Sequence, residues 1–170
     1  MIALKILDLR RFMSAFLTGD TFDGFQLLEG QITTFCTFQI DGRWQESFFS
    51  RDSKDPDSEE EAGEAPVRYT PWSSLKEYCY SLIRGKRTPL SFRFIFQTSP
   101  EQTDELFTGT EGLRETVRSL SLNLRYDGSS LFLTTGTSRT GFTRDRSADH
   151  LWDEWVLEFL RDAGVASELL

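Results

Sequence analysis

Few residues of this chain are of the types that carry out chemistry, and His150 is the only histidine. Cys36 and Cys79 lie far apart, so one histidine and two cysteines do not supply neighbouring ligands for a tetrahedral zinc site. A Ser-His-Asp triad would have to use His150, and no Gly-x-Ser-x-Gly segment provides a nucleophile elbow. We predict no metal site and no cofactor, and we expect His150 to lie exposed near the start of a helix.

Carboxylate clusters are a second source of catalysis, since paired acids can act as general acid and base or hold Mg²⁺. The densest run, Glu59 to Glu61, lies within residues 51–66, a segment without aromatic or branched aliphatic side chains. This composition predicts a solvated, disordered loop, which cannot supply the rigid pocket that a catalytic carboxyl needs. No catalytic residue is predicted, and the sequence favours a protein that is not an enzyme.

A segment rich in hydroxyl and small residues, Thr134 to Gly141, precedes two arginines. As a loop it would bind an anion through backbone N–H groups, with arginines neutralising the charge. The predicted ligand-binding residues are Gly136, Ser138, Arg139, Arg144 and Arg146, with Arg84, Lys86 and Arg87 as a second basic group. The alternatives are a turn between two strands and, for the second group, cations that favour a helix C-terminus. A single basic patch forms only if the two groups meet in space.

Four tryptophans offer a different kind of site, because indole is favoured at the centres of protein interfaces. Trp44 and Trp72 fall on apolar strand and helix positions, which favours the core for both. Trp152 and Trp155 lie on a helical stripe wide enough to leave one of them exposed. We therefore predict Trp152 and Trp155 as interface residues, with a core position as the alternative.

Hydrophobic periodicity then gives the elements of the first half of the chain. Alternation predicts a strand at 2–6 and another at 31–40, and 25–28 is a further candidate strand. A helix with apolar residues from Leu9 to Leu17 follows Asp8 as its N-cap and stops at Gly19. Asp41-Gly42 is a two-residue hairpin signal leading into a strand that contains Trp44 and Phe48.

The second half begins with a helix at 72–83, behind Thr70 and Pro71 and ended by Gly85. A core strand at 92–96 and a short helix at 99–106 follow. Asp127-Gly128 predicts a hairpin between strands at 120–126 and 131–133, with a third strand at 140–144 completing a meander. The last helix spans 151–160, behind Ser147 or Asp149 as its cap, and stops at Gly164.

These elements predict an α+β fold with curved, mainly antiparallel sheets and three main helices. The order of a strand, a helix and further strands occurs twice, an order similar to that of one sliding-clamp domain. A chain of 170 residues fits a single domain, 1–170, with the acidic loop at 51–66. Likeness of element order alone does not give a function.

Charge and apolar runs limit the partners. The net charge is −8, and much of it belongs to residues 51–66, so the chain lacks a broad basic footprint for nucleic acid or anionic lipid. No run approaches the roughly 20 apolar residues of a membrane span. Two buried free thiols are expected for Cys36 and Cys79, and the cytoplasm is the expected compartment.

Three stretches resemble a known family: residues 2–8, residues 84–93, and residues 134–138 together with 152–154. The family consists of uncharacterised proteins from anaerobic Gram-positive bacteria, classed as a domain of unknown function. The resemblance covers nearly the whole chain apart from the acidic loop. It implies a single bacterial cytoplasmic domain and carries no activity, substrate or site residues.

The first hypothesis for function is a binding or assembly module without enzymatic activity. Its partner would be another protein or a second copy of the chain, bound at a sheet edge or on the last helix. The second hypothesis is a protein that binds a small phosphate, nucleotide or nucleic-acid ligand through the basic Gly/Thr/Ser loop. An enzyme of an unfamiliar type is the third.

Overall fold

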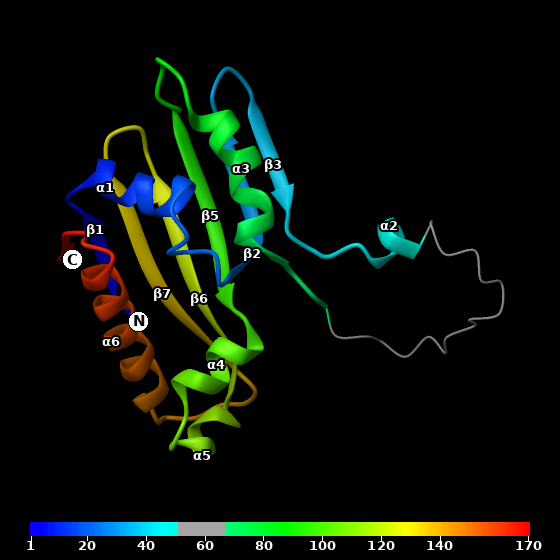
Figure 1. Ribbon diagram of the computed structural model, residues 1–170. Helices are drawn as coiled ribbons and strands as arrows, with labels where there is room; N and C mark the ends of the chain where they lie inside the picture. The colour runs from blue at the N-terminus through cyan, green and yellow to red at the C-terminus, as the bar shows by residue number, and fades with distance from the viewer. Residues whose placement is uncertain (51–66) are drawn as a thin grey trace.

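An antiparallel sheet forms the body of the computed structural model, which describes residues 1–50 and 67–170. Its strands are β1 (Ala3–Ile6), β2 (Phe25–Thr33), β3 (Thr37–Asp41), β4 (Thr70–Pro71), β5 (Ser91–Thr98), β6 (Val117–Tyr126), β7 (Leu131–Arg139) and β8 (Ser167–Leu169). Their order is β3-β2-β5-β6-β7-β1-β8, and β4 pairs with β2. The α+β class is confirmed, but the strands form one continuous sheet that is not strongly curled (Figure 1).

Three main helices cover one face of this sheet (Figure 1). They are α1 (Leu9–Met13), which continues as the π-helix η1 (Ser14–Thr18), then α3 (Trp72–Ile83) and α6 (Ser147–Asp162). Three shorter helices are α2 (Glu46–Ser50), α4 (Pro100–Leu106) and α5 (Glu111–Arg114). The predicted disordered loop at 51–66 lies outside the described residues.

A layer of aromatic side chains fills the space between the sheet and the three main helices. Trp72 begins α3 and stacks on Phe16 of η1, with ring centroids 4.6 Å apart. The Trp72 indole also donates to the Phe16 carbonyl at 2.8 Å, which satisfies a backbone acceptor within the π-helix. The largest fully buried side chains include Phe12, Phe16, Phe22, Phe25, Phe94, Phe96, Phe107, Trp72 and Trp152.

The central and C-terminal strands follow the sequence prediction with one exception. Phe92, Phe94 and Phe96 of β5 are buried, and the Asp127-Gly128 turn joins β6 to β7 as predicted. The predicted third strand at 140–144 is wrong. Its place beside β7 is taken by the N-terminal strand β1, whose Leu4 pairs with Leu133. Long-range pairing of this kind leaves no signal in the local sequence.

The segment around β3 departs most from the prediction. The predicted strand at 31–40 is broken by a turn at 34–36, where the Thr34 N–H donates to the Cys36 carbonyl at 2.9 Å. Gly42 is not at a hairpin apex; its N–H continues the ladder to the Leu28 carbonyl at 3.0 Å. A Cβ at Gly42 would lie 1.7 Å from the Leu27 carbonyl oxygen, so close backbone approach explains this glycine.

The predicted strand after Gly42 is wrong as well. Residues from Glu46 form the short helix α2, and Trp44 stacks on Phe49 at 4.9 Å instead of joining the core. The last helix also starts earlier than predicted, at Ser147, whose N–H and hydroxyl both donate to the Asp145 carboxylate. Gly164 ends it with a positive φ of 68°, as predicted.

The two cysteines lie in opposite environments. Cys79 is fully buried on α3, as predicted, and burial raises the pKa of its thiol to about 12. Cys36 lies in the turn before β3 and is exposed, so the prediction of two buried thiols is wrong for it. The turn at 34–36 carries Cys36 out of the strand position that the periodicity suggested.

We expect a thiol reagent such as DTNB to titrate one thiol in the native protein near pH 8 and both in denaturant. Only the thiolate reacts, and the buried Cys79 stays protonated at that pH. The variant Cys36→Ser should leave no rapidly reacting thiol. Equal reaction rates for both cysteines in the native state would contradict this placement of α3.

Candidate functional site

The predicted anion-binding loop is not a loop. Gly136 and Ser138 lie inside β7, where Gly136 pairs with Ser121 of β6. A Cβ at Gly136 would lie 2.5 Å from the Ser121 hydroxyl oxygen, so the glycine makes room for a neighbouring side chain. From Gly136 to Arg139 the extended backbone is paired with β6, so its N–H groups alternate in direction and do not wrap around an anion.

Arg139 is used to attach β7 to the last helix. Its guanidinium lies 3.0 Å from the Asp149 carboxylate. Burial raises the pKa of Asp149, but hydrogen bonds from Thr137 and Arg139 outweigh it, so the pKa is lowered overall. One helical turn later, the Thr135 hydroxyl and the α-amino group of Met1 both donate to the Asp153 carboxylate. The result is a polar seam between β7 and α6.

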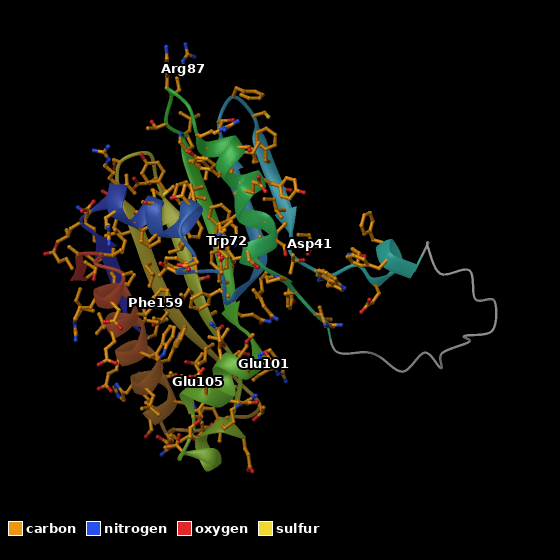
Figure 2. The ribbon with its side chains drawn as sticks, viewed as in Figure 1. Asp41, Trp72, Arg87, Glu101, Glu105 and Phe159 are labelled. Atoms are coloured by element: carbon orange, nitrogen blue, oxygen red, sulfur yellow. The ribbon has the colours of Figure 1, made fainter. Side chains whose placement is uncertain are left out.

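The two basic groups lie at opposite ends of the sheet. Arg139 is the last residue of β7, and Arg144 and Arg146 follow it. Arg84, Lys86 and Arg87 precede the start of β5. β7 begins where β5 begins, because Tyr126 pairs with both Phe92 and Leu131. Its nine residues separate the groups by about 26 Å. The register and length of β7 therefore exclude one shared patch. Figure 2 shows Arg87 at the opposite end of the sheet from Glu101 and Glu105 of α4.

The two tryptophans of the last helix differ in how far they are buried. Trp152 is 1% exposed, and its indole donates to the Ser121 carbonyl at 3.1 Å. Trp155 is half-buried and stacks between Trp152 and Phe159. Trp152 thus takes the core position given as the alternative, whereas an interface role for the half-buried Trp155 stays a prediction. The other partner surface named by the sequence is a sheet edge.

The outer edge of β3 is that sheet edge. β3 is the first strand of the sheet order, and no other described strand pairs with its outer side. Three backbone bonds fix which groups face outward. The Gly42 N–H donates to the Leu28 carbonyl, and the Thr34 N–H donates to the Cys36 carbonyl. On the opposite side of β2, the Leu90 N–H donates to the Thr33 carbonyl. By the alternation of an antiparallel ladder, Thr37, Gln39 and Asp41 direct their N–H and C=O groups away from β2.

A hollow of about 600 Å³ adjoins the start of β3. One wall is formed by Phe35 of the turn and Phe38 of β3, and the other is the end of α3 with Leu82. The loop between α3 and β5 closes it with Arg84, Lys86, Arg87 and Leu90. Among the residues that the structure describes, no acidic side chain lines it, and no ion pair includes these three cations. We call this hollow the β3 groove.

Apolar side chains protrude at the rim of the β3 groove. Phe35 at the tip of the turn is 93% exposed, and Leu90 in the facing loop is 67% exposed. Grouped, exposed apolar side chains beside cations are typical of interaction sites. The sequence reasoning missed this site because it placed Phe35 inside a strand; the run Thr33-Thr34-Phe35-Cys36 carries no glycine or proline to signal a turn.

Other candidate chemistry is sparse in the described part of the chain. His150 is exposed on the first turns of α6. No group of three or more His, Cys, Asp or Glu side chains within residues 1–50 and 67–170 is placed to hold a metal ion. Among the same residues, no helix has the length and apolar character needed to cross a bilayer.

Comparison with known proteins identifies a family. The model of a family of unknown function, DUF5721, matches residues 15–168, nearly the full length of the chain. The chain belongs to the DUF5721 family. No curated protein and no solved structure matches it. Membership in DUF5721 agrees with the resemblance noted from the sequence and carries no activity, so the geometry of the β3 groove and edge is the basis for a function.

We expect Arg139→Gln to lower the free energy of unfolding by about 1 kcal/mol at neutral pH, because the bond to Asp149 is only partly screened by solvent. A lowered carboxyl pKa contributes stability above the unfolded-state value and loses it as pH falls. The difference from wild type should therefore shrink toward pH 3. Urea denaturation at both pH values measures it.

Arg144→Gln is the matched control, because Arg144 is exposed. We expect it to leave the free energy of unfolding unchanged at either pH. If Arg139→Gln were as neutral as this control, the polar seam would not hold β7 to α6.

Proposed function

We propose that this DUF5721 protein is a protein-binding module that adds an extended segment of a partner protein to the outer edge of β3. The observation that carries the proposal is the open edge itself. The N–H and C=O groups of Thr37, Gln39 and Asp41 face away from β2, and no described strand takes them up. Strand addition satisfies such groups and gives affinity through main-chain hydrogen bonds.

The sequence of β3 lacks the residues that usually protect an edge strand against pairing. Natural edge strands carry Pro, Lys or inward-pointing charges that prevent association. The sequence of β3 is Thr-Phe-Gln-Ile-Asp, which contains no Pro and no Lys, and its only charge is at the last position. An edge left in this state is consistent with a functional contact for another strand.

The β3 groove supplies selectivity. Side chains of an added strand alternate between the two faces of the sheet, and those on the helix side would lie near Phe38 and Leu82. At the same end, Arg84, Lys86 and Arg87 favour acidic residues on the ligand. The partner segment is therefore an extended one with apolar residues at alternate positions and acidic residues at one end.

The cytoplasm is the compartment that fits this proposal, because both cysteines are free thiols and one of them is exposed. The small-ligand alternative from the sequence has less support, since its loop is part of β7 and its two basic groups lie apart. Arg84, Lys86 and Arg87 keep a role here as the acidic-end contact.

The test compares three bait proteins in capture from a lysate of the source cells: wild type, Gln39→Pro and Gln39→Ala. Proline at position 39 removes one outward-facing N–H and no bond to β2, so the fold is preserved. Alanine removes the side chain and keeps the N–H. We expect a stoichiometric protein that wild type and Gln39→Ala retain and that Gln39→Pro loses by at least about tenfold.

Near-UV circular dichroism of each bait checks that the aromatic layer is intact. Equal retention of the partner by Gln39→Pro and wild type would refute strand addition on β3. Loss with Gln39→Ala as well as with Gln39→Pro would show that the side chain, and not the main chain, is recognised.

A further inference from the structure

A second hollow lies beneath the main helices, separate from the β3 edge. Its volume is about 400 Å³, which falls in the range of small-molecule sites. It opens between α1 with η1 on one side and the end of α3 with the following loop on the other. Most of its lining is apolar: Leu9, Met13, Leu17, Tyr80, Ile83, Pro89, Phe92 and Tyr126, with Ser14, Thr18, Arg84, Gly85 and Thr88.

The floor of this hollow is aromatic and leaves no polar group unsatisfied. Phe92 of β5 and Tyr126 of β6 are both buried and stack with centroids 5.0 Å apart. The Tyr126 hydroxyl donates to the Gly128 carbonyl at 2.9 Å. A ligand that reaches the floor therefore contacts two rings and finds an environment suited to an apolar body.

The π-helix forms a wall that is held in place from outside the hollow. The Trp72 indole donates to the Phe16 carbonyl. The Lys76 ammonium donates to the Gly19 carbonyl at 2.7 Å and forms an ion pair with Asp23 at 2.6 Å. The Thr18 hydroxyl donates to the Ser14 carbonyl. Because α3 fixes both the middle and the end of this segment, the hollow is formed before any ligand enters.

Within residues 1–50 and 67–170, Arg84 is the only charged residue of the lining. It is exposed, its guanidinium lies 5.9 Å from the centre of the Tyr80 ring, and no ion pair among the described residues includes it. A planar guanidinium at the mouth of an apolar hollow matches one carboxylate at the end of an apolar body.

We infer that this hollow binds a small monocarboxylate with an unbranched or aromatic apolar body, the body on Phe92 and Tyr126 and the carboxylate at Arg84. The site does not depend on strand addition at β3. The two hollows share only Arg84, Gly85 and Thr88 of the intervening loop.

The experiment titrates the full chain with octanoate and, separately, with 1-octanol, followed by calorimetry or by amide chemical shifts. Arg84→Gln removes the cation, and Lys86→Gln is its matched control, since Lys86 lines the β3 groove and not this hollow. Ile83→Trp fills the hollow, and Leu82→Trp on the same helix is its control. Ser14→Phe, at an exposed wall position, serves if Ile83→Trp does not fold.

We expect the wild-type protein to bind octanoate. Ile83→Trp or Ser14→Phe should lower the affinity for octanoate by at least about tenfold. Arg84→Gln should lower the affinity for octanoate by about three- to tenfold and change the affinity for octanol by less than about twofold. The affinity for both ligands should be unchanged in Lys86→Gln, Leu82→Trp and Gln39→Pro. This result would distinguish the site from the β3 edge. No octanoate binding at millimolar concentration, or binding unchanged by both filling variants, would overturn the proposal, as would equal losses of octanoate and octanol in Arg84→Gln.

Discussion

The structure depends on one constraint: a single aromatic layer must bury one face of a wide sheet. Three main helices cover that face (Figure 1), and Phe16, Trp72 and Phe94 meet at its centre, with Trp72 joining two helices through a stack and a hydrogen bond. Apolar burial of this kind is the main favourable term in folding. The layer buries most of the phenylalanines, whereas Phe35 and Leu90 near the β3 end of the sheet stay exposed.

The margin of this layer is where both candidate sites arise. β3 is the end strand of the sheet, next to β2, and no described strand pairs with its outer side. The loop from Arg84 to Leu90 then has to return from α3 to β5 and passes between the two hollows. Helix packing thus fixes the η1 wall of the hollow beside α1. The β3 groove lies instead at the unpaired edge of the sheet. Both candidate sites lie where the aromatic layer ends.

The sequence predicted elements whose signals are local. Alternation at Phe92, Phe94 and Phe96, the Asp127-Gly128 turn and the stripe before Gly164 all survive in the structure, because each is set by residues within one element. The failures depend on distant partners. Position 42 requires glycine because the Leu27 carbonyl lies close to it, and position 136 requires glycine because the Ser121 side chain does. Residues 140–144 do not form a strand beside β7, because β1 occupies that place. The turn at Phe35 has no glycine or proline, so the exposed edge could not be read from the sequence.

The central claim is that the outer edge of β3 is free to pair with another strand, and amide hydrogen exchange tests it residue by residue. The amides of Phe38 and Ile40 face β2, whereas those of Thr37, Gln39 and Asp41 face outward. The account predicts alternation, with slow exchange at Phe38 and Ile40 and fast exchange at the three outward positions. Uniform protection of all five amides in the isolated protein would contradict it, because the edge would then already be covered.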